Sequence, residues 1–104
     1  MVTQQAAIET VKDFVREVKG QGVHLRHVFL YGSVSRNTQH EHSDIDVALV
    51  SDQFSGVGFL DIPLFVKALR KHYIIQPKTF STKDFENGDA FAEEIKKTGM
   101  EIKL

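Results

Sequence analysis

Two short apolar runs restrict the fold of this chain more than any other feature. Residues 23–31, "VHLRHVFLY", end at a glycine, and residues 43–50, "SDIDVALV", begin with a polar pair after a polar segment. The first run alternates and then becomes fully apolar, the second is mainly apolar, and both follow or precede turn residues, which predicts a strand in each case. The second run is rich in isoleucine and valine, which is typical of a central strand with both faces covered. We therefore expect a sheet built around these two strands.

Helical patterns lie on both sides of this pair. Apolar residues recur at helical spacing in the first segment, with Thr3 as its N-cap and Gly20 or Gly22 at its end; they are Ala7, Ile8, Val11, Phe14, Val15 and Val18. A second helix is predicted over residues 58–72, where Pro63 is tolerated only near the first turn. The apolar positions of this second helix are Phe59, Leu60, Leu64, Phe65 and Leu69.

The C-terminal part predicts another strand and another helix. Residues 73–80, "YIIQPKTF", form a strand that Pro77 restricts to an edge or a bend. Ser81 followed by Asp84 resembles a capping signal, residues 89–99 form a last helix, and "MEIKL" adds a short final strand. The order predicts an α/β or α+β fold, a small mixed sheet flanked by helices, in a single domain over residues 1–104.

Composition narrows the class of protein. The 104 residues include 13 basic and 14 acidic side chains, giving a formal net charge of −1, so charge alone does not favour nucleic acid as a partner. The chain has no cysteine, no pattern of a targeting segment and no apolar stretch of membrane-spanning length. We expect a cytoplasmic protein that does not enter a membrane.

The two aspartates that open the second strand carry the strongest chemical signal. Asp44 and Asp46 are two residues apart, so on a strand their side chains point to the same face. Like charges at this spacing repel unless a cation lies between them. Oxygen ligands on a rigid strand suit Mg²⁺, which takes its remaining ligands from water and substrate phosphates. The pair therefore predicts a metal that binds together with a phosphate-bearing substrate.

The small-residue turn after the first strand supplies a complement to the metal. Gly32 permits close backbone approach, and Ser33 offers a hydroxyl and an amide to a phosphate oxygen. Arg36, one turn further on, can bind phosphate through its forked guanidinium. We expect this anion site and the metal site to lie at adjacent strand ends.

Gly32-Ser33, Arg36 and the Asp44-x-Asp46 pair, in "YGSVSRNTQHEHSDIDVALV", resemble the signature of the DNA polymerase β-type nucleotidyltransferase superfamily. The short chain is similar to the minimal nucleotidyltransferase branch, which consists of single catalytic domains. The resemblance implies transfer of a nucleoside monophosphate, most often AMP from ATP, to a hydroxyl acceptor. It also implies that Gly32 and Ser33 hold the triphosphate, that Asp44 and Asp46 bind Mg²⁺, and that Arg36 supports the phosphates or the loop.

The resemblance implies a second role. Many minimal nucleotidyltransferases are antitoxins that bind, and in some cases modify, a helical HEPN-type partner toxin. A homodimer or a complex with such a partner is compatible with the short chain and its edge strand. The alternative to an enzyme is thus a nucleotide-binding antitoxin module that acts by binding its partner.

One departure from the family weakens the catalytic prediction. Relatives place a third carboxylate on a later strand, where this chain has Gln76, and an amide is a poor proton acceptor. Asp52 follows the wrong end of its strand, whereas Asp61 and Asp84 are expected on helices in solvated or capping roles. Turnover is therefore in doubt.

Other polar residues in the region have plainer interpretations. Asp44 and Asp46 could be a turn cap and a polar strand start, Ser33 a turn residue, and Arg36 half of a surface ion pair. The histidines of "HEH", His40 and His42, lack a third ligand at useful spacing and are expected in a solvated loop. Two residues complete this set. Tyr31 is expected to pack at the strand end, and Lys78 is either a phosphate contact or an edge lysine.

Overall fold

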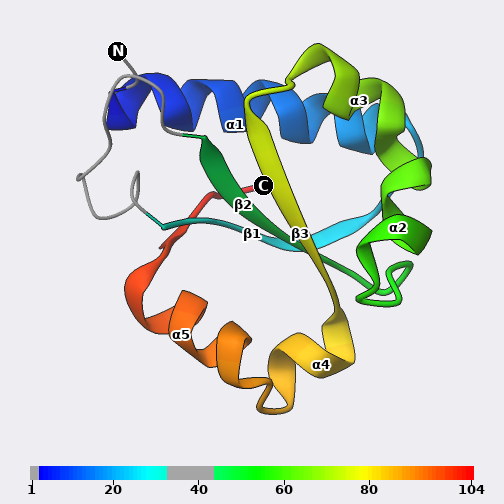
Figure 1. The fold of residues 1–104 in the computed structure, drawn as a ribbon, viewed down its shortest axis with the longest axis vertical. Helices are drawn as coiled ribbons and strands as arrows, with labels where there is room; N and C mark the ends of the chain where they lie inside the picture. The colour runs from blue at the N-terminus through cyan, green and yellow to red at the C-terminus, as the bar shows by residue number, and fades with distance from the viewer. Residues whose placement is uncertain (1–2, 33–43) are drawn as a thin grey trace.

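The computed structural model describes residues 3–32 and 44–104 (Figure 1). Its helices and strands follow in chain order: α1 (Gln4–Gly20), β1 (Leu25–Tyr31), β2 (Ile45–Ser51), α2 (Gly58–Asp61), the 3₁₀ helix η1 (Ile62–Phe65), α3 (Val66–Lys71), β3 (Ile75–Ser81), α4 (Thr82–Glu86), α5 (Ala90–Thr98) and β4 (Met100–Glu101). None of the helices in these two ranges is both long and apolar enough to cross a membrane.

The four strands form one mixed sheet in the order β3-β2-β1-β4. β2 is antiparallel to β1 and parallel to β3, and β4 is antiparallel to β1. The parallel pair requires a crossover connection, which α2, η1 and α3 provide. The prediction of a small mixed sheet flanked by helices is confirmed, as are the central position of β2 and the edge position of β3.

One face of the sheet is covered by the longest helix. The Thr3 hydroxyl accepts a hydrogen bond from the Ala6 amide at 3.0 Å and caps α1 as predicted. The apolar side of α1 packs with residues from η1, α3 and the strands, in a cluster that includes Val11, Phe14, Val28, Leu30, Val47, Leu49, Phe65 and Ile75. In Figure 1 the sheet separates α1 and α3 from α4 and α5.

The opposite face is covered over only part of its length. α4 and α5 pack there in a second cluster made of Phe29, Ala48, Val50, Phe80, Phe85, Ala92 and Ile95. Toward the other end of the same face, neither α4 nor α5 nor any other described helix provides cover: Tyr31 and Asp46 are only partly buried, and Gln76 is exposed. This open end of the sheet is where β1 ends and β2 and β3 begin.

The continuous helix predicted over residues 58–72 is wrong. The segment is divided into α2, η1 and α3, with Pro63 in the first turn of the 3₁₀ helix. Proline lacks the N–H that an α-helix would need at this point, so the chain tightens and changes direction there. Of the predicted apolar positions, Phe65 is buried, whereas Phe59, Leu60 and Leu64 are exposed.

The predicted capping signal at Ser81 and the predicted final strand are both confirmed. The Ser81 hydroxyl accepts a hydrogen bond from the Asp84 amide at 3.1 Å, so the capping signal is confirmed as the start of α4. Asp89 caps α5 through its Oδ1 atom, which accepts from the Phe91 and Ala92 amides. The C-terminal residues add β4 to the free edge of β1.

Candidate functional site

Gly32 and Asp46 face each other across the end of the β1–β2 pair. Gly32 has a φ of 74°, a conformation that side chains rarely adopt. A Cβ on Gly32 would also collide with the Asp46 carboxylate. The group that lies against the Gly32 backbone in this structure is thus the Asp46 carboxylate, and the contact of Gly32 with a phosphate stays a prediction.

Asp46 occupies the middle of a row of three side chains. Its neighbour on β1 is Tyr31, and its neighbour on β3 is Gln76. Directly opposed residues of adjacent strands place their Cβ atoms about 4.5–5.5 Å apart on the same face. Asp44 lies immediately before β2 and is exposed. The sheet thus brings a phenol, a carboxylate and an amide together at its open end.

The parallel register pairs Gln76 with Asp46, so the residue that β3 places beside this aspartate carries an amide in place of a carboxylate. Within residues 3–32 and 44–104, no group of three or more histidine, aspartate or glutamate side chains could hold a metal ion.

Tyr31 has an electrostatic environment that the sequence did not indicate. Burial, followed by the nearby charge of Asp46, raises the pKa of Tyr31 to about 12. Its ring also packs edge-on against Phe91, with 5.5 Å between the centroids, so the predicted packing role is confirmed. The phenol therefore remains protonated at physiological pH beside the carboxylate, where an O–H group is a hydrogen-bond donor.

Lys78 lies on the same strand face as Gln76, two residues further along β3. It is partly buried, and its Nζ atom lies 5.5 Å from the centre of the Phe80 ring. It is the one cation that β3 contributes to this face. Ser33, Arg36, His40 and His42 fall outside the residues that the structure describes.

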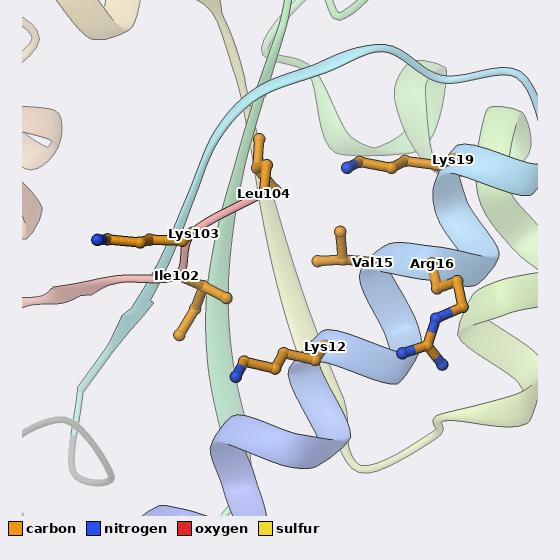
Figure 2. A pocket seen from close by; sticks show the side chains of 7 residues that line it. All are labelled: Lys12, Val15, Arg16, Lys19, Ile102, Lys103 and Leu104. Carbon is orange, nitrogen blue, oxygen red and sulfur yellow. The ribbon is translucent and has the colours of Figure 1, made fainter.

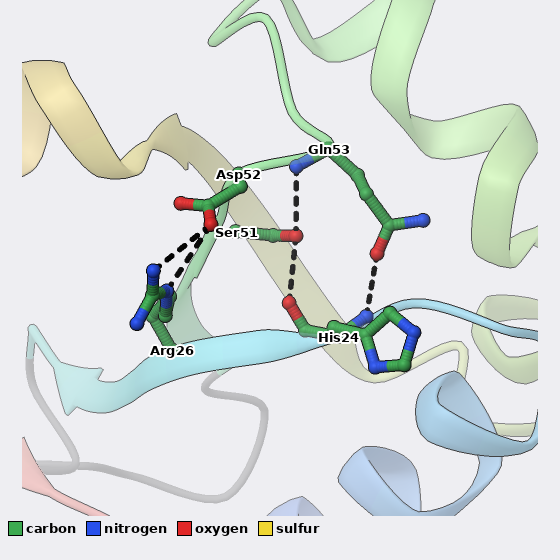
Figure 3. A network of polar contacts seen from close by, with 5 residues as sticks. All are labelled: His24, Arg26, Ser51, Asp52 and Gln53. Carbon is green, nitrogen blue, oxygen red and sulfur yellow. Dashed lines mark hydrogen bonds and ion pairs between the residues drawn. The ribbon is translucent and has the colours of Figure 1, made fainter.

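Asp52 belongs to a polar network at the opposite end of β1 and β2 (Figure 3). Arg26 donates to its Oδ2 atom through Nη2 at 3.0 Å and through Nε at 3.3 Å. In the same network the Ser51 hydroxyl donates to the His24 carbonyl, and Gln53 accepts from the His24 amide. These contacts close the far end of the strand pair, which agrees with the exclusion of Asp52 as a metal ligand.

The prediction of a solvated or capping role for Asp61 is wrong. Its side chain is buried and accepts four hydrogen bonds: from the Ser55 amide at 2.8 Å, the Ser55 hydroxyl at 3.0 Å, the Gly56 amide at 2.9 Å and the Thr79 hydroxyl at 2.7 Å. Burial opposes its ionisation, but the hydrogen bonds outweigh this and lower the pKa of Asp61. Asp61 therefore ties the β2–α2 loop to β3.

A separate hollow of about 260 Å³ lies beside α1 and the last residues of the chain (Figure 2). Lys12, Val15, Arg16 and Lys19 line it from α1, and Ile102, Lys103 and Leu104 line it from the C-terminal segment, with the Lys103 side chain pointing away from α1. The hollow contains none of Asp44, Asp46 and Gln76. It is a basic surface depression between α1 and residues 102–104, and it is distinct from the open end of the sheet.

Comparison with known families decides the class of the protein. The model of the family described as "Nucleotidyltransferase domain" matches residues 8–102. The chain belongs to this nucleotidyltransferase family. The match includes both β1 and β2 and therefore the whole segment between Gly32 and Asp46. The superfamily inferred from the sequence signature is thus confirmed.

Comparison with solved structures supports the fold of this nucleotidyltransferase. It resembles the crystal structure of a "putative nucleotidyltransferase from Sulfolobus solfataricus", with a TM-score of 0.69 and 18% sequence identity over 94% of this chain and 80% of that chain. No curated protein matches the chain at a significant level. At this low identity the structural likeness establishes the shared fold alone.

Proposed function

We propose that this nucleotidyltransferase carries out Mg²⁺-dependent transfer of a nucleoside monophosphate, AMP from ATP, to a hydroxyl of a protein or small molecule. The observation that carries the proposal is the row of Tyr31, Asp46 and Gln76 at the open end of the sheet, with Gly32 against the carboxylate. Membership of the family supplies the reaction class.

The donor set fits the metal. Asp44 and Asp46 offer carboxylate oxygens, and Gln76 offers an amide oxygen, all of which are ligands that Mg²⁺ accepts. Mg²⁺, when bound, would neutralise charge on the triphosphate and on the departing pyrophosphate. Asp44 and Asp46 would hold it, while water and the substrate would complete its coordination.

The chain's own groups would then position the substrate. Gly32 and Ser33 would hold the phosphates through the turn after β1, with Arg36 and Lys78 as cationic contacts. An acceptor hydroxyl would attack the α-phosphorus, the bond from that phosphorus to pyrophosphate would break, and the hydroxyl proton would pass to solvent. Tyr31, protonated and directly opposite Asp46, would offer its O–H group as a donor in this site.

A second candidate function has its own observation. Gln76 stands next to Asp46, where relatives place a third carboxylate, and an amide neither adds charge to the metal site nor accepts a proton well. The chain would then be a nucleotide-binding module of the minimal nucleotidyltransferase type that acts as an antitoxin by binding a HEPN-type toxin. The two candidates share nucleotide binding and differ in turnover.

Calorimetric titration with ATP tests what the two candidates share. We expect binding in the presence of Mg²⁺ and loss of binding in EDTA. Asp46→Asn should abolish the Mg²⁺-dependent heat, whereas Asp52→Asn, at the other end of the same strand pair and in an exposed ion pair, should leave it unchanged. Unchanged affinity in folded Asp46→Asn would overturn the site.

A transfer assay then separates the candidates. The product of a neighbouring gene encoding a HEPN-type protein is the acceptor to test with radiolabelled ATP. Incorporation of label that depends on Asp46 supports the enzyme. Formation of a stable complex without incorporation of label supports the binding module. Size-exclusion chromatography of each protein alone and of the mixture shows whether the chain forms a homodimer or a complex with this partner.

A further inference from the structure

Phe91 has an unusual combination of fixed position and exposure. It lies in the first turn of α5, on the helix that covers one face of the sheet, yet 43% of its surface is exposed. Its ring contacts Tyr31 edge-on at 5.5 Å and Phe80 at 6.1 Å between centroids. Two aromatic neighbours therefore hold the ring while much of it remains open to solvent.

The location of Phe91 relative to the proposed site follows from the sheet register. Tyr31 is directly opposite Asp46, so Phe91 is separated from that carboxylate by one side chain. Phe80 pairs with Val50, four residues along β2 from Asp46. Phe91 thus lies where the part of the sheet face covered by α4 and α5 meets the open end of the same face.

The backbone around Phe91 is fixed as well. Its amide donates to Asp89 Oδ1 at 2.9 Å, and the next amide, of Ala92, donates to the same atom at 3.1 Å. Ala92 itself is fully buried against the sheet. The N-cap fixes the backbone of Phe91, and two aromatic rings contact its side chain. The ring therefore loses little conformational entropy when a ligand binds, which favours binding.

We propose that the base of the bound nucleotide stacks on the exposed surface of Phe91. This inference rests on the proposed function, because the phosphates must lie at Asp44 and Asp46. In a nucleotide the ribose separates the base from the α-phosphate, and Phe91 lies one side chain away from Asp46. Stacking on an aromatic ring is available to every base, since each has a π face.

The proposal makes a statement about selectivity. Phe91 is an apolar ring and cannot read the hydrogen-bonding edge of a base. Stacking grows with the area of overlap, so purine triphosphates should bind more tightly than pyrimidine triphosphates. ATP and GTP should differ little through this residue, and inorganic tripolyphosphate, which has no base, should gain nothing from it.

The test compares ATP with inorganic tripolyphosphate, both with Mg²⁺, by calorimetry. Phe91→Ala should weaken ATP binding by about 5- to 150-fold, the range that loss of one stacked base gives, and should leave tripolyphosphate binding unchanged. Phe91→Leu keeps an apolar side chain of similar bulk without a ring and should behave like Phe91→Ala. Phe91→Tyr should retain wild-type affinity. The matched control is Phe59→Ala, which removes a ring that is 78% exposed in α2.

Each outcome has one meaning. ATP affinity that is unchanged in folded Phe91→Ala and Phe91→Leu, while the wild-type protein binds ATP, overturns the base site and leaves the proposed function standing. Equal weakening of ATP and tripolyphosphate also overturns it, because the loss then concerns the phosphates. A wild-type protein that binds neither ligand overturns the proposed function itself.

Discussion

A side chain at Gly32 and the carboxylate of Asp46 would occupy the same space. The backbone that follows β1 therefore fits around the carboxylate of Asp46 on β2. The close approach of the two strand ends requires that residue 32 has no Cβ. Because the family signature contains both residues, the geometry gives a physical reason for the glycine that does not involve phosphate.

Gly32→Ala should displace Asp46 and weaken Mg²⁺-dependent ATP binding by about tenfold or more. The new methyl group meets a carboxylate and also has to adopt a positive φ. Gly22→Ala is the matched control, because Gly22 has a φ of 94° and nothing within contact distance of an added Cβ. Both variants should lose about 1–2 kcal/mol of stability from the backbone. Equal ATP affinity in the two variants would contradict the role assigned to Gly32.

Gln76→Glu should tighten Mg²⁺ binding, by about tenfold, and accelerate transfer. The variant keeps the shape of the side chain and places a carboxylate beside Asp46, where a divalent cation would offset the repulsion between like charges. Gln76→Ala, which removes the oxygen, should show neither gain. Titration with Mg²⁺ followed by the transfer assay measures both effects, and a Gln76→Glu protein that matches Gln76→Ala would place the amide outside the metal site.

Tyr31 should titrate at unusually high pH. Tyr73→Phe leaves it as the sole tyrosine, so the absorbance of the phenolate reports its pKa directly. The pKa should be about 12. Adding Asp46→Asn should lower it without restoring the ordinary value of 10.0, because burial is the larger cause and the charge of Asp46 the smaller one. An identical midpoint with and without Asp46 would show that the two groups do not interact.

The same shift has a consequence for stability. A phenol whose pKa is higher in the folded state than in the unfolded chain favours folding fully below pH 10.0, and this contribution is lost as the pH rises toward 12. Alkaline unfolding should therefore begin at lower pH in the wild type than in a Tyr31→Phe variant of equal neutral-pH stability, as monitored by circular dichroism.

Asp61→Asn should destabilise the fold by about 2–4 kcal/mol, because an amide group would face donors that now bind a carboxylate. Its lowered pKa means that this stabilisation is present above pH 3.8 and is lost as the pH falls through the folded-state pKa. Urea unfolding at neutral pH measures the difference. Asp13→Asn, which removes one side of an exposed ion pair with Arg16, should cost at most about 1 kcal/mol.

The sequence predicted those features that depend on local pattern. The first helix followed from apolar spacing and the cap at Thr3, and the placement of Gly32 and Asp46 at adjacent strand ends followed from two strands joined by a polar segment. The edge position of β3 followed from Pro77, because a proline is a poor member of a central ladder. In each case a single residue or a short period carries the information.

The failed prediction for Asp61 and the missed position of Phe91 both depend on residues far apart in the chain. Asp61 does lie on a helix, α2, but nothing in its own segment reveals that Thr79, 18 residues later, donates to it. The apolar sequence around Asp61 was the available signal for burial. Phe91 could not be placed beside Tyr31 at all, because only the packing of α5 on the sheet brings the two rings together.

The edge position of β3 also bears on how copies of this protein can meet. An exposed edge strand can extend its sheet into a neighbouring molecule, but Pro77 has no N–H to donate and Lys78 brings a charge to the strand. β3 is therefore a poor template for intermolecular β-pairing. Gln76, at the start of β3, is thereby kept free of an intermolecular strand partner.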